Sequence, residues 1–180
     1  MDAISIEGLR KSYDGKEIVL NDINLKVKSG EIFGFLGPNG SGKTTTVRIL
    51  NGILSPTEGK ASILGIPVGI NKLEIHKHCG VMTESSSCYE NLTARQNLIF
   101  FGQMHNMNSS ELNARVDYLL KTVGLEKDKD KKVKAFSTGM RKRISLAIAM
   151  VHNPEILFLD EPTSGLDPQN VINVMSVIQK

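Results

Sequence analysis

The chain contains 180 residues, of which 40% are apolar and 23% are charged. This balance indicates a globular domain that is large enough to bury a core. The formal net charge of +3 is too small to indicate a nucleic-acid partner by itself. No apolar run reaches the roughly 18 residues that a membrane-spanning helix needs, and the N-terminus lacks the pattern of a signal peptide. We therefore expect any membrane role to come through a partner protein.

The cysteines and histidines predict neither a disulfide framework nor a metal centre. Cys79 and Cys88 form no C-x-x-C pair, so we expect reduced thiols in a cytosolic protein. In the cluster His76-Lys77-His78, alternate residues would diverge on a helix, and no set of ligands with zinc spacing surrounds them.

Apolar patterns in the first part of the chain predict three strands and a helix before a short fourth strand. Alternation predicts half-buried strands around Ile4–Ile6 and Ile23–Val27. The almost wholly apolar Ile32–Leu36 predicts a strand that is covered on both faces. A helix is expected from about Thr44 to Asn51, and a short strand at Ala61–Leu64.

The middle of the chain reads as mostly helical. Thr93–Gln96 fits a capping box, and Asn108–Glu111 has the same type of helix start. The second of these helices carries one apolar face, made of Leu112, Val116, Leu119, Leu120 and Val123. We interpret the mixed charge run Glu126–Lys134 as a solvated loop rather than a nucleic-acid contact.

The last part of the chain predicts a helix, a buried strand and a second helix start. The helix Ile144–Val151 is expected to end at Asn153-Pro154. The strand Ile156–Leu159 follows, and Asp167-Pro168 predicts an N-cap with proline at the first helical position.

Strands that alternate with helices predict an α/β fold with a mostly parallel central sheet. The closely spaced early strands predict a small antiparallel sheet beside it, and the helical middle predicts an inserted α-helical subdomain. We expect a single domain over 1–180, with its core in 1–83 and 153–180 and the helical subdomain in 84–152.

A phosphate-binding loop is the most specific motif in the chain. It matches the pattern G-x-x-x-x-G-K-[ST] between a predicted strand and a predicted helix. Glycines permit backbone angles that aim N–H groups at phosphates, and the helix N-terminus adds positive potential. The lysine supplies a full charge, and the final hydroxyl is a ligand suited to Mg²⁺. The residues are Gly37, Pro38, Asn39, Gly40, Ser41, Gly42, Lys43 and Thr44.

Two carboxylates end the predicted strand Ile156–Leu159. Asp160 and Glu161 would lie at the C-terminal edge of the sheet, where ligands of open α/β sheets bind. Adjacent strand residues point in opposite directions, so the two acids cannot share one role. We assign Asp160 to Mg²⁺, through water, and Glu161 to the attacking water as the general base.

These motifs together resemble those of ABC ATPases. Gly37–Thr45 resembles their Walker A loop, Ile156–Glu161 their Walker B strand, and Phe136–Met140 the signature specific to the family. Ser164–Asp167 resembles their D-loop. The Phe-Ser-x-Gly-Met form, with Arg143 following, resembles the branch that drives drug, antibiotic or polysaccharide export.

The resemblance implies a phosphate-loop NTPase with a RecA-like core sheet, acting as the ATPase subunit of an exporter. Tyr13 would stack on adenine, while Thr45 completes the nucleotide-binding loop. Ser137, Thr138 and Gly139 would contact the γ-phosphate held by a second cassette, in a homodimer or heterodimer. The implied ligands are ATP and Mg²⁺, and the other partners are transmembrane permease subunits. The implied location is cytoplasmic, peripheral on the inner face of the cell membrane.

The chain departs from the family pattern at several positions. Glu84 stands where the family has a glutamine that contacts Mg²⁺, and its added negative charge should weaken nucleotide binding. Glu84→Gln is therefore expected to raise ATP affinity or turnover. Thr138 replaces the first signature glycine, with little expected effect.

The family's switch histidine follows a further strand beyond the position of Glu161, but no histidine follows His152 in this chain. That strand would lie between Ile32–Leu36 and Ile156–Leu159, and a gap there would leave backbone groups unpaired. We therefore expect a fragment or a truncated product, with poor ATP hydrolysis by the 180 residues alone. Two alternatives stay open: a soluble ABC ATPase without a transport role, and a degenerate ATP-binding protein without turnover.

Overall fold

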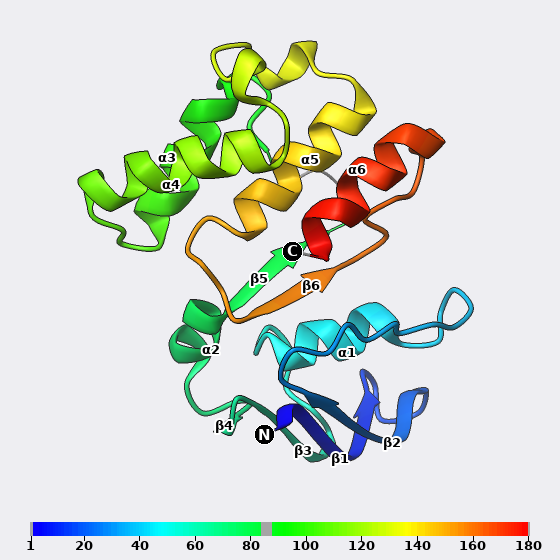
Figure 1. Ribbon diagram of the computed structural model, residues 1–180. Helices are drawn as coiled ribbons and strands as arrows, with labels where there is room; N and C mark the ends of the chain where they lie inside the picture. Colours follow the sequence, from blue (N-terminus) through cyan, green and yellow to red (C-terminus); the bar gives the residue numbers. More distant parts are fainter. Residues whose placement is uncertain (1, 84–87, 180) are drawn as a thin grey trace. The chain divides into compact units, whose positions relative to one another are not determined.

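A computed structural model describes residues 2–83 and 88–179, which divide into two compact units, Met1–Cys79 and Gly80–Lys180. Each unit is described by itself (Figure 1). The domain division expected from the sequence, with a helical subdomain at 84–152, stays a prediction. The elements in chain order are β1 (Asp2–Ser12), β2 (Ile18–Lys28), α1 (Lys43–Leu50), β3 (Glu58–Ile63), β4 (Ile66–Pro67), α2 (Lys72–His78), β5 (Cys79–Met82), α3 (Ala94–Met104), α4 (Ser109–Thr122), η1 (Glu126–Asp128), η2 (Val133–Ala135), α5 (Thr138–Ala149), β6 (Ile156–Leu159) and α6 (Pro168–Ile178).

The first unit is built on a four-stranded antiparallel sheet with the order β2-β1-β3-β4. Ile6 of β1 lies opposite Leu25 of β2 on one side and Ala61 of β3 on the other. The register shifts between Ile6 and Leu9, and this irregularity lets both side chains be buried although they are three residues apart. The antiparallel sheet predicted from the early strands is confirmed.

Helix α1 packs on this sheet against β2 and β3. Its apolar face buries Ile49 and Leu50, and Thr46 bonds back to the preceding turn instead of facing solvent. The unit's core therefore forms between α1 and the sheet, and it holds the start of α1 in place. The largest fully buried side chains of this unit are Ile6, Leu9, Leu20, Ile49, Ile63 and Ile75.

The predicted buried strand at Ile32–Leu36 is wrong. The segment has no strand structure in the part of the chain described, and all five residues are exposed. Ile32 is 69% exposed and Leu36 is 92% exposed. Apolar composition favours a strand only where neighbouring strands can pair with it, and no described strand pairs with this segment.

The described part of the second unit combines four α-helices with the strand pair β5–β6. The predicted apolar face of α4 is confirmed, because all five of its residues are buried in one core that also takes side chains from α3, α5 and α6. The capping box at Thr93–Gln96 is confirmed at the start of α3. The run Glu126–Lys134 is mostly exposed, but it contains the turns η1 and η2, and Val133 within it is buried.

Strands β5 and β6 lie side by side and run in the same direction (Figure 1). The N–H of Asp160 continues this pairing beyond β6, donating to the carbonyl oxygen of Met82 at 2.9 Å. The strand predicted at Ile156–Leu159 is thus confirmed, although its residues are half-buried rather than buried. No helix in residues 2–83 and 88–179 has the length and apolar content needed to cross a bilayer.

Candidate nucleotide-binding site

The backbone of the phosphate loop turns tightly just before α1. Gly40 and Gly42 have φ values of 82° and 87°, in the left-handed region that favours glycine. The N–H of Ser41 donates to the carbonyl oxygen of Pro38 at 3.2 Å, which closes the turn. Asn39 lies at the exposed tip. The two glycines therefore sit where a side chain would be strained.

Lys43 and the start of α1 give this loop its positive character. The Lys43 ammonium donates to the carbonyl oxygens of Gly37 at 2.7 Å and Pro38 at 2.8 Å, so it lies folded over the loop. Gly42 is the N-cap of α1 and offers no side-chain cap to the first-turn N–H groups. Thr44 follows in that turn and is exposed. A helix N-terminus without a side-chain cap, beside a lysine, suits an anion.

Tyr13 lies beside the same helix start, although it is far away in the sequence. Its hydroxyl lies 3.4 Å from Oγ1 of Thr45, in the first turn of α1. The Lys11 ammonium lies 5.3 Å from the centre of the ring, and the side chain is 59% exposed. An exposed ring next to a phosphate loop can stack on a flat base.

In the second unit, the acidic residues follow β6 directly. Asp160 continues the pairing with β5, and Glu161 then adopts a φ of 46°, which is unusual for a residue other than glycine. The carbonyl oxygen of Glu161 accepts from the Lys142 ammonium at 3.1 Å and from the N–H of Ser164 at 3.2 Å. The backbone turn that carries Glu161 is therefore bonded to α5 and to the segment that leads to α6.

The signature residues form the start of α5. Ser137 is the N-cap, and its hydroxyl accepts from the N–H of Met140 at 3.3 Å. Thr138 is exposed and Gly139 is buried in the first turn. A Cβ at Gly139 would lie 2.6 Å from the side chain of Asn170 on α6, so a larger residue at this position would have to displace that side chain. The helix predicted at Ile144–Val151 thus begins earlier, within the signature.

Asp167 is the N-cap of α6, with Pro168 at the start of the helix, as predicted. Its carboxylate accepts from the backbone N–H of Asn170 at 3.1 Å and from the side-chain amide of Asn170 at 2.5 Å. These hydrogen bonds favour the ionised form, so they hold the pKa of Asp167 below its ordinary value of 3.8. Asn170 therefore bonds to the Asp167 cap and also packs against the buried Gly139 of α5.

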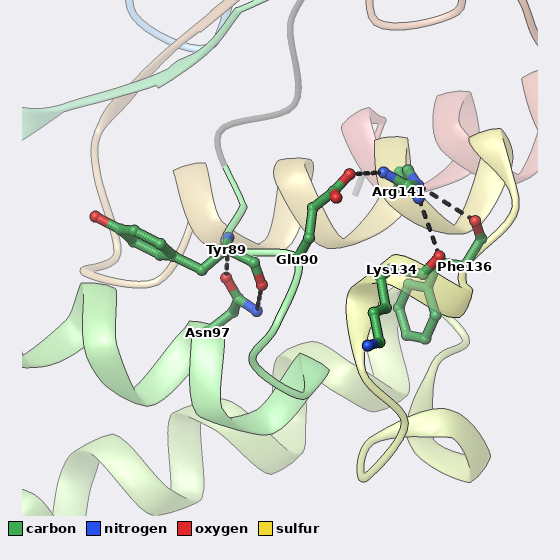
Figure 2. Close-up of polar contacts among 6 residues, drawn as sticks. All are labelled: Tyr89, Glu90, Asn97, Lys134, Phe136 and Arg141. Carbon is green, nitrogen blue, oxygen red and sulfur yellow. Dashed lines mark hydrogen bonds and ion pairs between the residues drawn. The ribbon is translucent and has the colours of Figure 1, made fainter.

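Two polar side chains hold the segment between residue 88 and α3 (Figure 2). Asn97 is fully buried; its oxygen accepts from the N–H of Tyr89 at 2.7 Å and its amide donates to Tyr89 and Thr93 carbonyl oxygens. Arg141, one turn into α5, makes an ion pair with Glu90. Its guanidinium also donates to the carbonyl oxygens of Lys134, at 3.1 Å, and Phe136, at 3.2 Å.

The structure thus brings together two groups of the residues predicted from the sequence. Tyr13 and the loop Gly37–Thr45 lie together in the first unit, while Asp160, Glu161 and the signature belong to the second. Their assembly around one nucleotide stays a prediction, and Glu84 lies outside the described residues.

Sequence reasoning did not single out Asn97, Arg141 or Lys142. Helical spacing was the signal that could have indicated two of them. Lys142 and Asn97 fall on the buried faces of their helices, where a polar residue needs a hydrogen-bond partner.

A phosphate loop at a helix start in the first unit and two acidic residues directly after a strand in the second are typical of a phosphate-loop NTPase of the α/β class. The family described as "ABC transporter" matches residues 20–164. The chain belongs to this family, and its fold is that of an ABC ATPase cassette.

Two known relatives are similar in sequence to nearly the whole of this chain. The linearmycin resistance ATP-binding protein LnrL of Bacillus subtilis is 34% identical over 98% of this chain and 57% of its own length. The bacitracin transport ATP-binding protein BcrA of Bacillus licheniformis is 42% identical, over 97% of this chain and 56% of its own length. The chain therefore spans somewhat more than half of these two relatives.

Solved structures resemble the chain over nearly its whole length. The cbiO1 structure from Clostridium perfringens, part of the ABC transporter complex cbiONQ, aligns with a TM-score of 0.90 and 31% identity, covering 99% of this chain and 72% of that one. A dimeric ATP-binding cassette in a post-hydrolysis state, bound to ADP and Pi, aligns with a TM-score of 0.84 and 29% identity, covering 97% and 81%.

Proposed function

We propose that this chain forms the ATP-binding cassette of an ABC exporter, in which ATP binding and hydrolysis power transport across a membrane. The observation that carries this proposal is the start of α1. Left-handed glycines, an N-terminus without a side-chain cap and the Lys43 ammonium converge there. The resistance and antibiotic-transport names of relatives support the exporter role. The expected location is the cytoplasmic face of the membrane, against transmembrane permease subunits.

The loop residues divide the recognition of ATP between them. The N–H groups of the loop and of the first turn of α1 bind phosphate oxygens, and Lys43 leaves the carbonyl oxygens of Gly37 and Pro38 to reach the β- and γ-phosphates. Tyr13, exposed beside Thr45, stacks on adenine. The triphosphate thus exchanges water for fixed donors, and the base is held by its flat face.

The residues assigned to Mg²⁺ fit that ion by the chemistry of their donors. The exposed Thr44 hydroxyl and the Asp160 carboxylate are hard oxygen ligands. In this proposal Mg²⁺, when bound, neutralises charge on the β- and γ-phosphate oxygens. Glu84, the third assigned ligand, contributes a carboxylate oxygen of the same kind.

Hydrolysis needs a base and a second cassette. Glu161 accepts a proton from the water that attacks the γ-phosphorus. The bond between the γ-phosphorus and the oxygen that bridges it to the β-phosphate breaks, which releases ADP and phosphate. The signature Ser137, Thr138 and Gly139 of one cassette contact the γ-phosphate bound by the other, because the start of α5 presents a hydroxyl and N–H groups. Loss of the γ-phosphate then releases the pair.

Binding and turnover of radiolabelled ATP by the intact protein test this proposal. Lys43→Ala is expected to weaken ATP binding at least about tenfold, since the lysine is a charged partner of the phosphates. Glu161→Gln should bind ATP but lose turnover. Lys60→Ala, an exposed lysine on β3, is the matched control and should behave like the wild type. Binding without turnover by the wild type would favour the degenerate alternative, and turnover without a permease partner in cells would favour the soluble one.

A further inference from the structure

Lys142 is a buried lysine in the signature helix. It lies one turn after Gly139 on α5, and only 6% of its surface is exposed. Lysine is almost never fully buried unless its ammonium has partners, because removing the charge from water is costly. Here the ammonium donates to the carbonyl oxygen of Glu161 at 3.1 Å. The buried charge is therefore directed at the backbone of the residue assigned as general base.

The carbonyl oxygen of Glu161 is shared between two donors. Besides Lys142, the N–H of Ser164 donates to it at 3.2 Å and closes a turn. That turn needs support, since Glu161 has a φ of 46° and a non-glycine residue adopts this conformation only when its surroundings hold it. Lys142 thus connects three segments: the signature helix, the end of β6 and the turn that leads to α6.

We propose that Lys142 is a positioning residue for ATP hydrolysis: its ammonium holds the backbone of Glu161 so that the carboxylate faces the attacking water. This inference rests on the proposed function, in which Glu161 is the base. Methionine would fill the same volume without the desolvation cost of a charge. The ammonium contributes what methionine lacks, a hydrogen-bond donor to the carbonyl oxygen of Glu161. Lys142 itself touches neither water nor nucleotide in this role.

Two variants of the intact protein separate positioning from packing. Lys142→Met keeps an unbranched side chain that lacks only the terminal ammonium group, and so removes the donor, whereas Lys142→Gln keeps a donor without charge. Lys142→Met is expected to lower kcat about tenfold, because losing a hydrogen bond from a charged donor commonly costs that factor. The Kd for ATP should stay within about twofold, because in this role Lys142 acts on the backbone of Glu161 and not on the phosphates. Lys142→Gln should recover part of the rate, and Lys121→Met, on the exposed side of α4, should change nothing.

Two further measurements make the result decisive. In a Glu161→Gln background, Lys142→Met should leave the residual rate unchanged, since residues that act as a unit are not additive. Amide hydrogen exchange over residues 160–166 should be faster in Lys142→Met and nearer the wild type in Lys142→Gln. If the wild type lacks turnover, the proposed function fails, while the exchange experiment still tests the contact. Unchanged exchange, or an equal loss of rate in the Glu161→Gln background, overturns the inference.

Discussion

Replacement of Gly42 by alanine tests the geometry that the start of α1 requires. Gly42 is buried, with a φ of 87°, at the N-cap of α1. A Cβ there would lie 2.3 Å from Cδ2 of Leu20 and 3.0 Å from the carbonyl oxygen of Val19. Leu20 belongs to the core and is only 2% exposed, so its side chain cannot move into solvent. The added methyl group must therefore displace β2 or the loop.

Two physical effects contribute to the expected loss of stability. The left-handed conformation costs an alanine about 1 to 2 kcal/mol, and overpacking in a tight site adds about 1 to 3 kcal/mol. We expect Gly42→Ala to lower the free energy of unfolding by about 2 to 5 kcal/mol. For a chain of this size that corresponds to a Tm lower by roughly 5 to 15 °C.

Gly40→Ala is the matched control for this experiment. Gly40 has a similar φ of 82°, but no atom lies within 4 Å of its Cβ position, so only the backbone cost applies. Urea unfolding without nucleotide compares the two variants, which keeps phosphate binding out of the result. Leu20→Ala should remove most of the extra cost of Gly42→Ala in the double variant, because the two residues share one contact. Equal destabilisation by Gly40→Ala and Gly42→Ala would refute the reasoning.

Three other substitutions test contacts elsewhere in the two units. Asn97→Ala should lower the free energy of unfolding, measured in urea, by about 2 to 4 kcal/mol, because the buried asparagine satisfies backbone groups of Tyr89 and Thr93. Asn91→Ala, at an exposed position, should change this free energy little. Equal losses of stability in the two variants would contradict the prediction. Asn170→Ala should raise the pKa of Asp167 toward its ordinary value, measured by NMR titration of the carboxyl carbon. Since the folded pKa is depressed, the Asp167 contribution to stability is present above pH about 4 and is lost as pH falls through the folded value. An unchanged pKa would exclude the side-chain amide of Asn170 as a cause of the depression. Tyr13→Ala should weaken ATP binding about tenfold or more, as loss of a base stack does, whereas Tyr13→Phe should bind normally; equal affinities would argue against stacking.

Local signals predicted much of the fold. Helix starts at Thr93, Asn108 and Asp167 depend on side chains that bond within three residues of themselves, and all three are N-caps in the structure. The apolar face of α4 follows from helical spacing alone and is buried as expected. The family resemblance, which rested on short motifs, is confirmed by the match over residues 20–164.

The failures concern partners that are distant in the sequence. Ile32–Leu36 has the composition of a buried strand but is exposed, because strand formation depends on a neighbouring strand that no local pattern specifies. The site assignments stay predictions where they depend on both units together, as for Thr44 and Asp160.

The sequence by itself determined the phosphate loop, the helix boundaries with side-chain caps and the family, because these depend on residue type and short spacing. Only the tertiary structure decided that Tyr13 lies beside Thr45, that Asn170 packs against Gly139 and that Lys142 bonds to Glu161. Each of these contacts joins segments separated along the chain. Their distance depends on how strands pair and helices pack, which is a property of the whole unit and not of any local stretch.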